Sequence, residues 1–155
     1  MTDLNKKILN DIRVELSEEF DRNFQKKAFF DRPWPNRKSR GNGSLLMVSG
    51  KLRRSIRCST GNDSVTWETS EAYAYIHNFG GTITVTAKMK RFFWYKFKAT
   101  ANAEWKWMAL MKVGAKITIP QRQFIGDHPQ VRRMVERIVN DNLTKAAQEL
   151  VKRLV

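Results

Sequence analysis

Residues 3–24 read DLNKKILNDIRVELSEEFDRNF, and an apolar side chain recurs at every fourth position of this stretch. The recurring residues are Leu4, Ile8, Ile12, Leu16, Phe20 and Phe24. An α-helix has about 3.6 residues per turn, so this spacing gathers the apolar side chains on one face. The stretch predicts an amphipathic helix that Thr2 or Asp3 caps. We expect it to stop in the run from Asp31 to Pro35, because Pro33 and Pro35 cannot continue a helix.

A second long helix is predicted at the other end of the sequence. Asp127 is its expected N-cap, Pro129 lies in its first turn, and the basic residues Lys152 and Arg153 close it. Its apolar stripe consists of Met134, Val135, Ile138, Ala146 and Leu150. Two long helices are therefore expected to frame the fold.

Short elements are predicted between residues 45 and 86. Residues 45–56 indicate a short apolar helix, with Gly50 either inside it or marking a break. Residues 56–59 and 65–68 are typical of a hairpin around a turn at 60–63. Residues 73–79 and 82–86 are rich in aromatic and β-branched side chains, which favours two strands reversed at Gly80 and Gly81.

The helical period returns after residue 86. Met89, Phe92, Phe93 and Phe97 make the apolar stripe of a predicted helix, with Thr86 as cap. Residues 103–113 fit a helix or a strand, and residues 117–119 indicate a strand that Pro120 ends. The expected fold class is α+β, with an antiparallel sheet packed against long N-terminal and C-terminal helices and shorter helices. Residues 1–155 are expected to form one domain, with a basic loop at about 31–44 whose length is typical of function or flexibility.

Composition favours a globular protein with a polyanionic partner. The 155 residues are 41% hydrophobic and 28% charged, with a formal net charge of +14. Residues 29–60 and 87–116 each carry eight basic residues and one acidic residue, whereas residues 61–86 carry three acidic residues and no basic one. Such a distribution predicts a polarised surface that attracts nucleic acid or acidic protein. No uncharged stretch is apolar enough to span a membrane, so we expect no membrane partner.

The sequence gives little support to catalysis. A phosphate-binding loop at Gly50 and Lys51 fails, because Leu45 and Leu52 stand where a Gly and a Ser or Thr are required. A nucleophilic pair would need Cys58 and His77 to meet, which the spacing does not indicate. His128 is interpreted as a neutral surface histidine at a helix start. We therefore expect no enzyme activity, no catalytic residues, no cofactor and no metal site.

The strongest nucleic-acid candidate is the run KMKRFFWYKFK at residues 88–98. Aromatic rings stack on bases while neighbouring cations hold phosphates, as in single-strand binding proteins. The alternative is a helix whose aromatic face is core and whose charged residues are solvated around it. Both interpretations remain open from the sequence.

Three motifs in order resemble a known family. They are LLMVSGKLRRSI at residues 45–56, AYAYIHNFGG at 72–81 and IPQRQFIG at 119–126, with Trp34-Pro35 upstream. Together they resemble the virion morphogenesis (tail completion) proteins of tailed bacteriophages, over roughly residues 27–140. The chain departs from the family pattern at Gln123, where the family commonly has Pro. The resemblance marks as structural residues Trp34, Gly50, Leu52, Tyr73, Ala74, His77, Gly80, Pro120, Arg122, Phe124 and Gly126.

The resemblance implies a non-enzymatic structural protein that completes or joins the tail at the head–tail interface. It implies a ring of identical subunits, with a hexamer as one candidate size, in contact with head–tail connector and tail tube proteins. The expected location is the tail or neck of the virion, after assembly in the bacterial cytoplasm. The alternative is a basic nucleic-acid-binding protein acting through residues 88–98. Candidate contacts to packaged DNA or an acidic partner are Arg37, Lys38, Arg40, Lys51, Arg53, Arg54, Lys88, Lys90, Arg91, Lys96 and Lys98.

Overall fold

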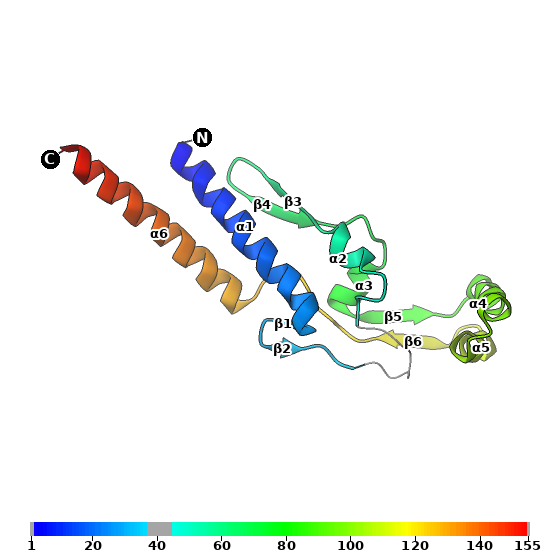
Figure 1. Cartoon of the computed structure of the whole chain (residues 1–155). Coiled ribbons are helices and arrows are strands. Elements are labelled where there is room, and N and C mark those ends of the chain that lie inside the picture. The colour runs from blue at the N-terminus through cyan, green and yellow to red at the C-terminus, as the bar shows by residue number, and fades with distance from the viewer. Residues whose placement is uncertain (1, 37–44, 155) are drawn as a thin grey trace.

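The computed structural model describes residues 2–36 and 45–154. Its two long helices, α1 (Asp3–Lys26) and α6 (Pro129–Leu154), lie side by side in opposite directions, so that the N-terminal end of α1 and the C-terminal end of α6 point to the same end of the molecule (Figure 1). Both helices were predicted, and both are confirmed. The Thr2 hydroxyl accepts a hydrogen bond from the backbone N–H of Asn5 and caps α1.

Polar contacts, some of them around the buried Asn142, hold α1 against α6. Lys7 Nζ lies 2.7 Å from Asn142 Oδ1, and the amide of Asn142 donates to the Asp11 carboxylate at 2.9 Å. Hydrogen bonds from Asn142 and Lys7 hold the pKa of Asp11 below its usual value. Arg137 pairs with Glu15 one turn further along. The pairs set the register between the two helices.

The end of α1 differs from the prediction. The helix ends at Lys26, before the prolines, because Lys27 takes a left-handed conformation with φ +54°. The chain then reverses into the short antiparallel pair β1 (Ala28–Phe29) and β2 (Arg32–Pro33). This reversal brings the buried Phe29 ring back onto Phe20, at 6.4 Å between centroids. Tertiary packing, not proline, therefore ends the helix.

The basic loop expected at 31–44 is only partly described. Its first residues form β2, and Trp34 is buried with 6% exposure instead of lying on the surface. Arg37, Lys38 and Arg40 lie outside the described residues. Gly50, at φ +64°, precedes α2 (Lys51–Ser55), so it marks a break and the helix is shorter than residues 45–56.

Strands of the described residues pair as separate antiparallel ribbons, which confirms the α+β class. The predicted hairpin is present as β3 (Arg57–Thr60) and β4 (Val65–Glu68), with Cys58 opposite Trp67. The other ribbon joins β5 (Gly81–Thr84) to β6 (Lys116–Ile119), which are far apart in sequence, with Ile83 opposite Ile117.

Residues 73–79 do not form the predicted strand. They lie in helix α3 (Ala74–Phe79), where Ala74 and Asn78, four residues apart, are the buried side chains. The aromatic residues suggested a strand, but burial of that one helical face against residues 124–125 overrides local propensity. Consequently Gly80 and Gly81 lead from a helix into β5, and they do not join two strands.

Helices α4 (Ala87–Thr100) and α5 (Ala103–Leu110) stand at the end of the β5–β6 ribbon, away from the long helices (Figure 1). We call residues 87–110 the arm. Thr86 caps α4 as predicted, through the N–H of Met89. The stripe is core only in part: Phe93 is buried, Met89 and Phe97 are half-buried, and Phe92 remains 48% exposed. The arm buries its apolar residues mainly within its own helix pair, because it lies away from the two long helices.

The core consists of two buried clusters. One lies between α1 and the first half of α6 and includes Leu16, Phe20 and Ile138. The second half of α6 extends beyond this contact, so Leu150, assigned to the buried stripe, is 60% exposed. The second cluster surrounds Phe24 and Phe124. None of the described helices is long and apolar enough to cross a membrane.

The start of α6 corrects two further predictions. The helix begins at Pro129, and His128 replaces Asp127 as its cap: His128 Nδ1 accepts from the N–H of Gln130 at 3.2 Å. Nε2 of the same ring is 2.9 Å from Asp31 Oδ1, so the proton lies on Nε2. His128 is 3% exposed and stacks on Phe30, so it is a buried residue and not a surface one. Asp127 pairs instead with Arg132.

Candidate interaction surfaces

Residues from the separate motifs meet in one buried cluster. Trp34, Leu52, Ala74 and Phe124 pack together around Phe24 of α1. The Phe24 ring centroid lies 5.7 Å from that of Trp34, edge to face, and 5.2 Å from that of Phe124. Each motif therefore contributes a side chain to one hydrophobic cluster, which we call the buried centre.

Two buried asparagines hold the segment from Gln121 to Gly126 against this centre. Asn78 Oδ1 accepts from the backbone N–H groups of Phe124 and Ile125 at 2.9 and 3.2 Å, and Asn78 Nδ2 donates to the Ile125 carbonyl at 3.1 Å. Asn23 Nδ2 donates to the Phe124 carbonyl at 3.2 Å. An irregular buried segment needs such partners for its backbone groups.

Sequence reasoning missed both asparagines and also Asn142. Asn142 lies four residues after Ile138, on the same face of α6, and Asn78 lies four residues after Ala74. A lone amide within an apolar helical face is a signal that could have identified these two residues, because a buried amide requires hydrogen-bond partners.

Arg122 and Trp34 join this segment to the residues that directly follow β2. Arg122 Nε donates to the Pro35 carbonyl at 3.0 Å, and its backbone N–H donates to the His77 carbonyl at 2.7 Å. Trp34 Nε1 donates to the Gln123 carbonyl at 2.6 Å. Arg122 is 7% exposed, so its contacts lie mostly inside the chain.

Several motif glycines and Pro120 shape the connections. Gly80 has φ +72°, and a Cβ there would lie 2.9 Å from the backbone N of Gln121. Gly126, at φ +133°, precedes α6, and Pro120 directly follows β6. Substitution of Gly80 is therefore strained twice, by φ and by a backbone contact.

His77 and Cys58 lie in different surroundings. His77 lines a small cavity with Tyr73 and Arg122, whereas Cys58 lines another with Asp21 and Trp67. Burial, helped by the charge of Arg122, lowers the pKa of His77. Within residues 2–36 and 45–154, His77 Nδ1 is the one buried side-chain polar atom without a hydrogen-bond partner. The same residues contain no group of three His, Cys, Asp or Glu side chains arranged to hold a metal.

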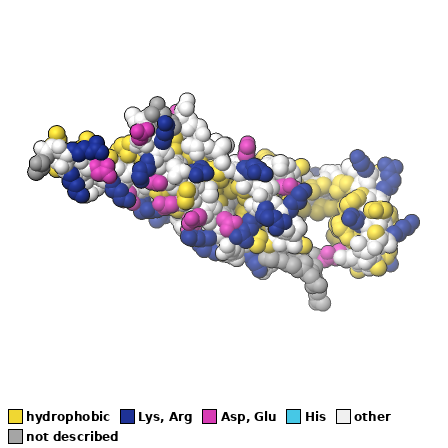
Figure 2. All heavy atoms as spheres, turned by 45° about the horizontal axis from the view of Figure 1, so that its top comes forward, with side chains coloured by type: hydrophobic (Ala, Val, Ile, Leu, Met, Phe, Trp, Pro, Cys, Tyr) yellow, Lys and Arg dark blue, Asp and Glu magenta, His cyan; other side chains and the backbone are white. Residues whose placement is uncertain are grey.

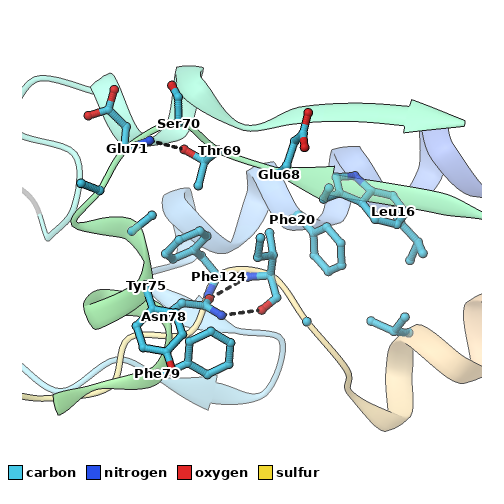
Figure 3. A pocket seen from close by; sticks show the side chains of 16 residues that line it. Leu16, Phe20, Glu68, Thr69, Ser70, Glu71, Tyr75, Asn78, Phe79 and Phe124 are labelled. Carbon is cyan, nitrogen blue, oxygen red and sulfur yellow. Dashed lines mark hydrogen bonds between the residues drawn. The ribbon is translucent and has the colours of Figure 1, made fainter.

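A large apolar groove opens between β4 and α3 (Figure 3). We call it the α3 groove; its volume is about 660 Å³. Phe20 and Phe124 lie inside it, and Glu68 and Glu71 lie on the β4 side. Tyr75 and Phe79 of α3 are 72% and 58% exposed, with ring centroids 4.8 Å apart. Its lining contains two acidic residues and no Lys or Arg.

The arm forms a second surface, where basic and hydrophobic side chains gather together (Figure 2). Phe93 packs on Trp105 at 6.0 Å between centroids, and Lys96 Nζ lies 5.7 Å from the centroid of the Phe92 ring. Other large side chains stay exposed: Trp94, Tyr95, Trp107 and Leu110. Large exposed apolar side chains close together are typical of an interaction site.

The candidate cations divide into two groups. Lys51 pairs with Glu71 at 3.1 Å, Arg53 pairs with Asp21, and Arg54 donates to the Ser49 carbonyl. These three serve contacts within the chain. The second group belongs to α4, and Lys88, Arg91 and Lys98 of that group are exposed. The arm is therefore the best candidate of the described residues for contact with a polyanion.

Comparison with known proteins gives one family. The sequence model described as the phage virion morphogenesis family matches residues 3–144. Neither the curated proteins nor the solved structures contain a match to the chain. The matched range includes both long helices in whole or in large part, the buried centre and the arm.

Proposed function

Because the chain belongs to the phage virion morphogenesis family, we propose that it is a structural subunit that completes or joins the tail at the head–tail interface. The subunits form a ring of identical copies, with a hexamer as one candidate size, and contact head–tail connector and tail tube proteins. The family match over residues 3–144 carries this proposal. A role in phage assembly follows from the family itself, whereas the place in the tail or neck is our proposal.

The shape of the chain supports an assembling role. Apolar side chains are exposed at two distant places, the arm and the second half of α6, including Trp107 at 65% and Leu154 at 85%. A protein that works alone rarely leaves such groups uncovered, whereas a subunit covers them with its neighbours. Head-to-tail contact between copies closes into a ring when the rotation per subunit allows it.

The test is to stop translation of this gene in the phage or prophage that encodes it. We expect filled heads and separate tails by electron microscopy, with joined particles restored when the gene is supplied in trans. Mass spectrometry of purified particles is expected to find the chain. Normal numbers of joined particles without the gene, or its absence from the particle, would refute the proposal.

A second candidate function is binding of nucleic acid through α4. The observation that favours it is the exposure of Trp94 and Tyr95 beside Arg91 and Lys98, since ring faces stack on bases while cations neutralise phosphates. A salt titration with short single-stranded DNA tests it, and Tyr95→Ala is expected to weaken binding without changing the slope against salt. No affinity at about 50 mM salt would exclude this function.

A further inference from the structure

We propose that the arm of one copy docks its exposed aromatic side chains into the α3 groove of the next copy. This inference rests on the proposed function, because it supplies the head-to-tail contact between subunits. It assigns a partner to each of two surfaces that the isolated chain leaves uncovered, the arm and the groove.

The arm offers rigid aromatic anchors. Tyr95 and Trp107 are 67% and 65% exposed, and Leu110 is 62% exposed. They project from a helix pair that is already packed internally by Phe93 and Trp105, so little ordering is required when they bind. Aromatic side chains of this kind dominate the centres of protein interfaces.

The α3 groove offers a matching receptor. Its volume of about 660 Å³ lies in the range of pockets that enclose a ligand, which is enough for inserted aromatic side chains. Phe20, Phe124 and Ala74 give it an apolar interior, and Tyr75 and Phe79 extend that surface outward (Figure 3). Within the described residues no buried side-chain amide or charge of the groove lacks a partner, so the groove selects an apolar occupant.

The charges of the two surfaces are complementary. Residues 87–116, which contain the arm, carry eight basic residues and one acidic residue. Residues 61–86, which supply much of the groove, carry three acidic residues and no basic one. Of the two that line the groove, Glu71 pairs with Lys51 of its own chain, and Glu68 is the carboxylate that can face the arm. Opposite charges around an apolar centre orient the partners and disfavour an arm-to-arm contact. The overall charge of +14 opposes association, so local pairing is needed for the correct contact.

The geometry points to contact between copies and not within one chain. The β5–β6 ribbon separates α3 from the arm by four residues of strand, about 13 Å, and holds the arm away from α3 (Figure 1). Groove and arm are therefore different patches of one chain. Contact between unlike patches is heterologous and propagates from copy to copy, as a ring requires.

Disulfide trapping tests the contact. On a Cys58→Ser background, Phe79→Cys marks the groove and Trp107→Cys marks the arm; both native side chains are more than half exposed, so the replacements leave the core intact. An equimolar mixture of the two single-cysteine chains is expected to give dimers, and the chain with both cysteines a ladder of covalent oligomers. The matched control replaces Phe79→Cys with Asn62→Cys, at an exposed polar position in the β3–β4 turn.

The trapping is carried out on the purified full-length chain and on assembled particles. We expect the yield with Phe79→Cys to exceed that of the control by about tenfold. The inference is overturned by equal yields, by no ladder in either preparation, or by dimers of the Trp107→Cys chain alone, which would show an arm-to-arm contact. If particles still join in the presence of the gene while trapping fails, the docking is wrong and the proposed function stands.

Discussion

Asn78 is predicted to be the most sensitive polar residue of the buried centre. Its side chain makes three hydrogen bonds to the backbone of Phe124 and Ile125 and is 5% exposed. Asn78→Ala removes all three and leaves two N–H groups and one carbonyl without their partner. A buried polar group left unpaired costs about 1–3 kcal/mol. Water entering from the adjacent α3 groove can hydrate part of this set, so we expect a loss of about 3 kcal/mol in the free energy of unfolding.

The measurement is urea unfolding followed by far-ultraviolet circular dichroism. A loss of this size lowers the midpoint of thermal unfolding by roughly 6–12 °C for a chain of this length. The urea m-value is expected to stay unchanged, because the same surface is exposed on unfolding. The matched control is Asn62→Ala, an exposed asparagine in the β3–β4 turn, with an expected change within about 0.5 kcal/mol.

A loss below about 1 kcal/mol for Asn78→Ala would refute this reasoning. It would show that the segment after Gln121 is held by its apolar side chains alone. Equal losses for Asn78→Ala and Asn62→Ala would have the same meaning.

Two further predictions concern the backbone and the pH dependence of stability. Gly80→Ala places a side chain at φ +72°, with its Cβ 2.9 Å from the backbone N of Gln121. We therefore expect the free energy of unfolding, measured with urea, to fall by about 2 kcal/mol or more. A urea midpoint equal to that of the unchanged chain would contradict the strain argument. The pKa of His77 is lowered in the folded chain, so below the ordinary pKa near 6.5 the unfolded chain binds more protons and the folded chain loses stability as the pH drops. In His77→Gln we expect the free energy of unfolding to depend less on pH between about pH 5 and 7. An identical pH dependence in the variant would contradict this assignment.

Much of the fold could be predicted because helical periodicity is a local property. The apolar repeat of α1 indicates which of its residues share a face, and Thr86 marks the start of α4. Both were predicted correctly. The hairpin β3–β4 was equally local, since its turn lies between its own strands. The same rules failed at residues 73–79, where a strand-forming composition is overridden by burial of Ala74 and Asn78.

The surfaces proposed for function were predicted only in part. The basic and aromatic character of residues 88–98 was recognised from the sequence, but the sequence left open whether its apolar stripe is core or an exposed binding face. The local sequence pattern does not show that α4 lies away from the two long helices. The exposure of Phe92 and Trp94 therefore could not be predicted. The α3 groove was missed entirely, because its walls come from α1, β4, α3 and the start of α6.

By itself the sequence determined the two long helices, the excess of positive charge and the ordered motifs that indicated a phage assembly protein. Only the tertiary structure decided that β5 pairs with β6, and that Trp34, Leu52 and Phe124 meet around Phe24. The physical reason is that periodicity records which side of an element is apolar, whereas the surface that covers this side is chosen by competition among contacts distant in the chain.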